Sequence, residues 1–202
     1  MARIDTPCLD YFSITLFDQI ISNTSQLVHF VNCTPNLKEP NEAHAIFDDG
    51  AVWVTVSSPG SGKLSVKIPC VGPERQLVSL AQFCTLLSPL LFTVEDLFVY
   101  KQKHSQSEFP DEDIDNTQWT GLLCPFTAVK NLYLCELFAP PILLALQELL
   151  EERMTEAFPI LQNIFIGGLW PPGPAQKAVD QFRVAARQLS SHPIVVSDWI
   201  MA

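Results

Sequence analysis

Apolar positions along the chain follow two periods, one typical of strands and one typical of helices. Three short runs, at 94–100, 129–134 and 161–166, carry apolar residues at relative positions 1, 4 and 6. Their starts lie 35 residues (94 to 129) and 32 residues (129 to 161) apart. The 1-4-6 positions match the L-x-x-L-x-L pattern of a leucine-rich repeat, in which a strand lines one face and a helix backs it, although the intervals exceed the usual length of roughly 20–29 residues and indicate long, irregular repeats. Near the N-terminus the same spacing recurs at Leu9, Phe12 and Ile14.

Helical periodicity fills the intervals between these runs. Apolar residues recur at i, i+3, i+4 and i+7, the pattern of a helix with one buried face. Pro174 suits the first turn of the last helix, and Pro140 and Pro141 precede the third. A weaker helical pattern covers 26–33. The four helical sets are Leu77, Leu80, Ala81, Cys84 and Leu87; Trp119, Leu122, Leu123 and Phe126; Ile142, Leu143, Leu146, Leu149 and Leu150; and Ala175, Ala178, Val179, Phe182, Ala186 and Leu189.

Residues 43–70 interrupt the alternation of strands and helices. Runs at 43–47 and 51–56 flank an Asp-Gly turn, which is a strong signal for a β-hairpin, and 64–68 alternates as a third strand. We therefore expect an antiparallel β-meander inserted at 43–70. The stretch 101–115 is polar and acidic, and we interpret it as an exposed loop.

These patterns predict one α/β domain over residues 1–202. The expected architecture is an irregular leucine-rich-repeat-like open solenoid of about five repeats, with parallel strands backed by helices. A doubly wound α/β sheet also alternates strands and helices and remains the competing interpretation. The solenoid is favoured because no Gly-rich phosphate-binding loop follows any of the strands.

Charge and cysteine content narrow the functional classes. The chain has 22 acidic and 12 basic residues and a net charge of −10, so no basic surplus is present to bind a nucleic-acid backbone. The six cysteines show neither a C-x-x-C motif nor a histidine at metal-ligand spacing. No apolar stretch approaches the roughly 20 residues needed to span a bilayer, and the first residues do not resemble a signal peptide. We expect reduced thiols, a cytoplasmic or nuclear location, and no membrane association.

Motifs for cofactors, metals and catalysis are incomplete. The segment 60–63 lacks the first Gly and the Ser or Thr of a phosphate-binding loop, and it suits a hairpin turn better. The acidic loop begins like a calcium site, but Asn116 and Leu122 replace the required Gly and Glu. The four histidines sit in no catalytic signature. We expect no cofactor, no metal and no enzymatic activity; an uncharacterised hydrolase-type enzyme is the alternative.

The strand pattern itself suggests a candidate partner-binding surface. If positions 1, 4 and 6 face the core, positions 3, 5 and 7 face the open side of the sheet. Aromatic residues at position 5 form a column there, which is a candidate docking strip. The competing interpretation is a cross-strand ladder worth about 0.2–1 kcal/mol per pair, shielded by the C-terminal tail or by Trp199. The candidate residues are Asp96, Phe98, Tyr100, Asn131, Tyr133, Asn163 and Phe165.

Several segments also resemble a known family. The sequence Phe126-Thr-Ala-Val-Lys-Asn-Leu132 is the most specific, and 138–140, 145–149, 161–165 and 185–194 add to it, with 2–5 and 47–50 further upstream. Together they resemble the C-terminal, leucine-rich-repeat-like region of the F-box domain proteins of mushroom-forming (basidiomycete) fungi, over essentially the whole chain. The resemblance implies the substrate-recognition region of an F-box (SCF) ubiquitin ligase.

The expected function is therefore protein–protein recognition of an unknown protein substrate. The F-box that precedes this region in the family is absent from the sequence, so we do not expect this chain to dock on the ligase scaffold by itself. A structural fragment with no partner of its own is a further alternative. Because solenoid ends expose strand edges, we expect self-association of the isolated chain at micromolar concentration, which sedimentation would detect.

Overall fold

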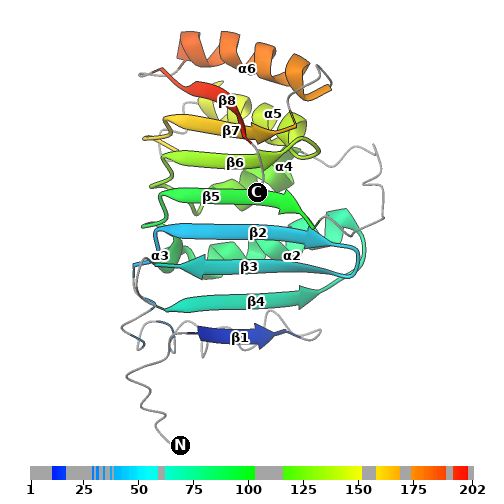
Figure 1. Cartoon of the computed structure of the whole chain (residues 1–202), viewed down its shortest axis with the longest axis vertical. Helices are drawn as coiled ribbons and strands as arrows, with labels where there is room; N and C mark the ends of the chain where they lie inside the picture. Colours follow the sequence, from blue (N-terminus) through cyan, green and yellow to red (C-terminus); the bar gives the residue numbers. More distant parts are fainter. Residues whose placement is uncertain are drawn as a thin grey trace, which may run out of the picture.

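The computed structural model has an α/β fold built on one mixed, mostly parallel sheet that does not close. It describes residues 11–16, 29, 31, 34, 37, 39–58, 62–102, 116–151, 158–168, 174–189 and 193–199. Within these residues the sheet has eight strands in the order β1-β4-β3-β2-β5-β6-β7-β8 (Figure 1). The strands are β1 Tyr11–Thr15, β2 Glu42–Asp48, β3 Ala51–Ser57, β4 Lys63–Pro69, β5 Asp96–Lys101, β6 Asn131–Cys135, β7 Asn163–Gly167 and β8 Val195–Trp199.

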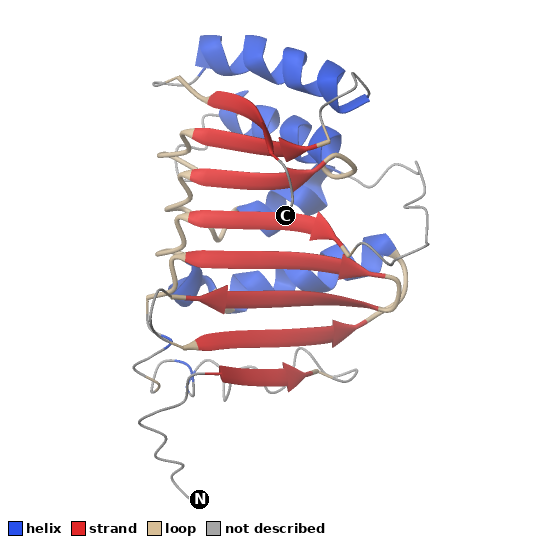
Figure 2. Cartoon of the chain, in the orientation of Figure 1, coloured by secondary structure: helices blue, strands red, loops and turns tan. Residues whose placement is uncertain are grey.

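The helices α2, α3, α4 and α5 lie together behind the sheet, and α6 lies at the β8 end, packed against α5 (Figure 2). A doubly wound sheet carries helices on both faces, so this one-sided arrangement in the described part of the chain argues against that alternative. Their bounds are α2 Pro73–Leu86, α3 Ser88–Leu91, α4 Asn116–Leu123, α5 Ala139–Glu151 and α6 Pro174–Leu189.

The predicted neighbours in the sheet are confirmed. Strands β5, β6 and β7 are parallel and adjacent in sequence order, and Leu97, Leu132 and Ile164 are aligned across them. Each strand begins two residues later than the apolar pattern indicated. The position-1 residues Val94 and Val129 are nevertheless fully buried, because they lie in the connections that lead from the helical layer into the strands.

One local hydrogen-bond geometry recurs where these strands begin. The backbone carbonyls of Asn41, Glu95 and Lys130 each accept hydrogen bonds from two consecutive amides at the start of the next strand, at 2.8–3.0 Å. The Gln162 carbonyl accepts from the Val195 amide at 2.8 Å. Four successive junctions, from β2–β5 to β7–β8, therefore hold their strands in matching register.

The antiparallel meander is confirmed, with β2, β3 and β4 joined in sequence and Asp49-Gly50 forming the first turn. It does not stand apart from the parallel strands as an insertion. Strand β2 pairs in parallel with β5, and β4 pairs in parallel with β1. The meander therefore supplies three of the strands of the common sheet, and its backbone edges are satisfied by parallel neighbours on both sides.

The core lies between the sheet and the helices. Alternate residues of β2, β5, β6 and β7 are buried, as expected for a sheet covered on one face. Three fully buried rings meet in its centre, where Phe47 of β2 lies 4.9 Å from Phe138 and 6.0 Å from Trp119 between ring centroids. Gln76 fixes the start of α2, because its buried side chain donates hydrogen bonds to the carbonyls of Asp48 and Cys70.

The helical predictions hold for α2, α5 and α6, and Pro174 begins α6 as expected; α2 ends one residue before Leu87, and α5 begins at Ala139, so that Pro140 and Pro141 lie in its first turn. Helix α4 ends at Leu123, so Phe126 lies beyond it, although its side chain is buried. The short helix α3 was not predicted. The helix predicted at 26–33 and the loop predicted at 101–115 lie almost wholly outside the described residues, and Lys101 belongs to β5 and not to the loop. Within the described residues, no helix combines the length and the apolar character needed to cross a bilayer.

Candidate functional site

All seven candidate residues lie on the face of the sheet that the helices do not cover, which we call the open face. Their neighbours in sequence, such as Leu97, Leu132 and Ile164, are buried on the opposite face. Along β5, β6 and β7 the half-buried candidate residues alternate with these buried neighbours. The assignment of strand positions 3 and 5 to the open side is therefore confirmed, while partner binding there stays a prediction.

Strand position 3 forms a hydrogen-bonded row, which we call the amide ladder and which consists of Asp96, Asn131 and Asn163. Asn163 donates from Nδ2 to Oδ1 of Asn131 at 2.8 Å, and Asn131 donates from Nδ2 to Oδ1 of Asp96 at 2.7 Å. The chain of donors ends on a carboxylate, which strengthens hydrogen bonds of this kind. Beside the ladder, Lys130 forms an ion pair with Glu95 at 2.6 Å.

Strand position 5 forms a continuous stack of parallel rings. Phe98 lies 4.1 Å from Tyr133, and Tyr133 lies 4.7 Å from Phe165, between ring centroids. A fourth ring from β2 extends the stack, because His44 lies 4.5 Å from Phe98 with its plane only 9° away. We call these four residues the aromatic column. The remaining candidate, Tyr100, contacts the edge of His44 at 6.0 Å and does not stack within the column.

A tryptophan from the last strand covers part of the aromatic column. The Trp199 ring lies 5.3 Å from Tyr133 and 5.8 Å from Phe98, although β8 is hydrogen-bonded only to β7 among the described strands. Its partner in register is Gly167, where a Cβ would lie 3.8 Å from the indole, an ordinary van der Waals distance. The anticipated shielding by Trp199 is therefore present, and the column residues remain half-exposed beside it.

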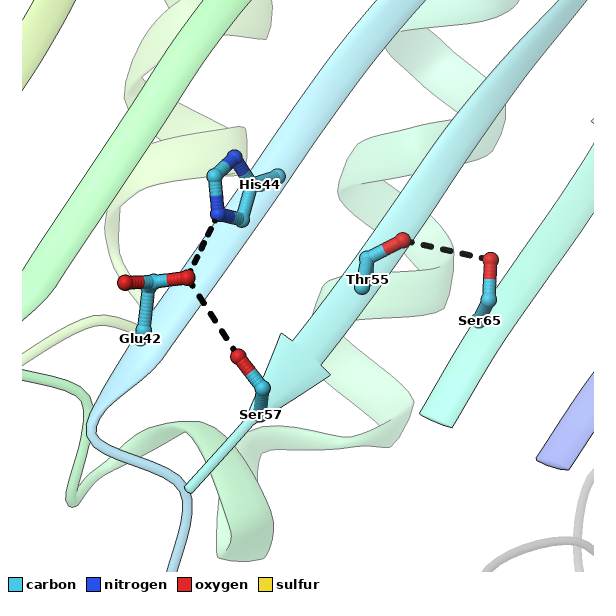
Figure 3. Close-up of polar contacts among 5 residues, drawn as sticks. All are labelled: Glu42, His44, Thr55, Ser57 and Ser65. Atoms are coloured by element: carbon cyan, nitrogen blue, oxygen red, sulfur yellow. Dashed lines mark hydrogen bonds and ion pairs between the residues drawn. The ribbon is translucent and has the colours of Figure 1, made fainter. Parts of the chain in front are cut away.

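Polar groups on β2, β3 and β4 continue the open face (Figure 3). Oε1 of Glu42 accepts hydrogen bonds from Nε2 of His44 at 2.7 Å and from the Ser57 hydroxyl at 3.4 Å. This geometry places the proton of His44 on Nε2. Beyond them, the buried hydroxyls of Thr55 and Ser65 lie 3.2 Å apart.

Sequence analysis missed Glu42 and His44 as members of this surface. The 1-4-6 pattern is present in β2 and its approach as Pro40, Ala43 and Ala45, all of which are buried. Proline and alanine are weak signals of a buried strand. The row of polar and aromatic residues that accompanies the pattern, with Glu42 at position 3 and His44 at position 5, is the signal that could have found them.

The two tyrosines on β5 and β6 report the electrostatic character of the face. Burial raises the pKa of Tyr133, and the negative charges of Asp96 and Glu42 raise it further. Burial and the charge of Glu42 likewise raise the pKa of Tyr100. The carboxylates therefore impose a negative potential across the aromatic column.

This potential predicts a measurable titration. Because both phenols have raised pKa values in the folded state, the stability they contribute is fully present below pH about 10 and is lost as pH rises through the raised values. Removing the charge of Glu42 should lower both pKa values toward that of a free phenol. Phenolate absorbance of Glu42→Gln, compared with wild type and with Glu74→Gln on α2, measures the shift; identical curves for all three would contradict the prediction.

The described residues offer little for metal or thiol chemistry. Within them, no group of three or more His, Cys, Asp or Glu side chains is arranged to hold a metal ion. Burial raises the pKa of Cys70, Cys84, Cys124 and Cys135. A reactive cysteine needs the opposite shift, because the thiolate is the nucleophile.

The fold and its open face define an α/β protein with one helix-covered and one solvent-facing side of a mixed sheet. Comparison of the chain with family models, with curated proteins and with solved structures finds no match in any of the three.

Proposed function

We propose that the chain is a protein–protein recognition module that binds its partner on the open face. The observation that carries this proposal is the aromatic column, a row of stacked, half-exposed rings on a sheet face that the described helices leave uncovered. Aromatic side chains dominate the energetics of protein interfaces, because they bury large apolar areas at low entropic cost. Hydrogen-bonding groups of the amide ladder lie directly beside the column and can supply specificity.

The finer form of this proposal is a leucine-rich-repeat-like solenoid whose open face is the concave side. The shared 1-4-6 pattern, the recurring hydrogen bonds at the strand starts and the one-sided helices support it. The resemblance to F-box proteins of mushroom-forming fungi supports the role of substrate-recognition region of an SCF ubiquitin ligase. The partner is then an unidentified protein substrate in the cytoplasm or nucleus. Self-association through the solenoid ends stays a prediction, and at the β8 end it would compete with α6, whose Arg183 donates a hydrogen bond to the Val196 carbonyl at 2.9 Å (Figure 1).

Hydrolytic catalysis is the rival, and Glu42, His44 and Ser57 are the groups it would use. A serine nucleophile requires a hydrogen bond to the histidine base. Here the Ser57 hydroxyl donates to Glu42, which also accepts from His44. The three residues lie on a broad sheet face, and one pocket among the described residues is a shallow hollow elsewhere, beside Ile160 and Val195. This arrangement favours recognition over catalysis.

Binding on the aromatic column predicts a loss of partners when its central ring is removed. Tyr133→Ala should abolish capture of those proteins from a basidiomycete lysate that wild type retains. Phe92→Ala is the matched control, because Phe92 is an exposed ring at the end of α3, away from the open face. Quantitative mass spectrometry of the three eluates measures the difference.

Proteins that bind wild type and Phe92→Ala, but not Tyr133→Ala, identify ligands of the face. If every captured protein binds all three variants equally, recognition by this face is wrong.

The ligase role has a separate test, in which an F-box module is fused before residue 1 and ubiquitination of a captured protein is followed in a reconstituted reaction. Unmodified partner in that reaction would contradict the substrate-receptor role and leave recognition by the face intact.

A further inference from the structure

Two carboxylates lie directly opposite each other on the open face. Glu42 of β2 and Asp96 of β5 are partners in the parallel register between these strands. Like charges in directly opposite positions destabilise a sheet. The fold alone therefore gives no reason for this pair, because uncharged glutamine and asparagine could accept the same hydrogen bonds.

Both carboxylates are held in place by hydrogen-bond donors of the same sheet. Glu42 accepts from His44 and Ser57, and Asp96 accepts from Asn131 of the amide ladder (Figure 3 for Glu42). Among the described residues, neither carboxylate forms an ion pair with a lysine or an arginine. The two charges are thus fixed on the surface, with acceptor capacity left for a donor from outside the chain.

Among the described residues, the ring nitrogen Nδ1 of His44 also lacks a hydrogen-bond partner. That atom is shielded from bulk solvent. The hydrogen bonds of His44 are therefore incompletely satisfied at the end of the aromatic column where Glu42 and Asp96 lie.

Among the residues that the structure describes, the lysines of the open face lie on β4. Lys63 and Lys67 are on β4, two strands from Glu42 in the register, and Lys67 packs over the Trp53 ring at 4.6 Å. The chain as a whole carries a net charge of −10. A partner with basic groups is therefore attracted at long range and finds two carboxylates, at β2 and β5, that no described lysine or arginine neutralises.

We propose that the open face binds a polypeptide segment that presents lysine or arginine next to apolar side chains, with the basic group seated between Glu42 and Asp96. This inference rests on the proposed recognition function and names the chemistry of its partner. The apolar part of the segment packs beside Trp199, along the edges of Phe98 and Tyr133 that this indole leaves uncovered, since the faces of those rings are occupied by their stacked neighbours. Arginine suits the site best, because its planar group can donate to two carboxylates at once.

The test is selection of a random peptide library displayed on phage against the full chain. Enriched peptides should carry Arg or Lys beside an aromatic or aliphatic residue. Their affinity should fall about tenfold or more for the double variant Glu42→Gln/Asp96→Asn, and it should fall with rising salt. The control is Glu74→Gln/Glu151→Gln, which removes the same two charges from the exposed surfaces of α2 and α5 and should leave affinity unchanged.

Both double variants should keep or raise the melting temperature, because the substituted amides can accept the same hydrogen bonds; this check separates loss of charge from loss of folding. Peptides without basic residues, or peptides bound equally by Glu42→Gln/Asp96→Asn, would overturn the proposed partner chemistry. If such peptides still lose affinity in Tyr133→Ala, recognition by the open face stands and only the basic partner is wrong. Peptides that bind Tyr133→Ala as wild type overturn both.

Discussion

Leu132→Ala should lower the free energy of unfolding by about 2–5 kcal/mol, whereas Tyr133→Ala, one residue further along β6, should cost clearly less. Leu132 is fully buried between the sheet and the helices, so its truncation leaves a cavity that the packed core cannot fill. Tyr133 is half-exposed on the open face, and its loss removes ring contacts with Phe98, Phe165 and Trp199. Urea denaturation of both variants measures the two changes.

The order of these two effects is the decisive outcome. Leu134→Ala, fully buried two residues further along the same strand, should resemble Leu132→Ala. If Tyr133→Ala proves the more destabilising substitution, the ring contacts on the open face contribute more to the free energy of unfolding than the buried side chain of Leu132. The aromatic column would then be mainly a structural element and not a binding surface.

Phe47→Ala should be at least as costly, at about 3–5 kcal/mol. Phe47 is fully buried, and its ring packs against both Phe138 and Trp119, which are themselves 5.4 Å apart. These contacts join the meander to the layer formed by α4 and α5. Truncation should therefore leave a cavity and also weaken the packing of the meander against α4 and α5.

The control for this substitution is Phe92→Ala, because Phe92 is the same residue type with 54% of its surface exposed. It should change the free energy of unfolding by less than about 0.5 kcal/mol. Thermal or urea unfolding of both variants gives the comparison. A small effect of Phe47→Ala would mean that the core around β2 can rearrange and that the three rings do not act as a unit.

The strand-and-helix alternation, the order of β5, β6 and β7 and the facing of their side chains could all be predicted from the sequence. Large apolar residues at positions 1, 4 and 6 mark the buried side strongly, and a one-residue error would have reversed every assignment. The hairpin around Asp49-Gly50 was also clear, because its turn signal is local. Local patterns of this kind are the part of a fold that a single sequence expresses most directly.

Long-range relationships could not be read in the same way. The pairing of β2 with β5 could not be predicted because the buried positions of β2 include Ala43 and Ala45, and alanine is a weak signal of a strand. The parallel pairing of β1 with β4 joins residues about fifty positions apart, and no local pattern specifies it. The contact of Trp199 with Phe98 reaches from β8 across β7 and β6 to β5. The sequence indicated that Trp199 could shield the column, but it did not indicate which rings Trp199 would contact.

The recurring hydrogen bonds at the strand starts have a consequence for how this protein can change during evolution. Since the backbone fixes where each strand begins, equivalent side chains from β2, β5, β6 and β7 fall in rows, and the residues of each row alternate with core positions along the strand. A substitution in a row alters the displayed surface and leaves the packed interior untouched. Binding specificity can therefore diversify by single replacements, in duplicated genes or in directed libraries, at little risk to folding.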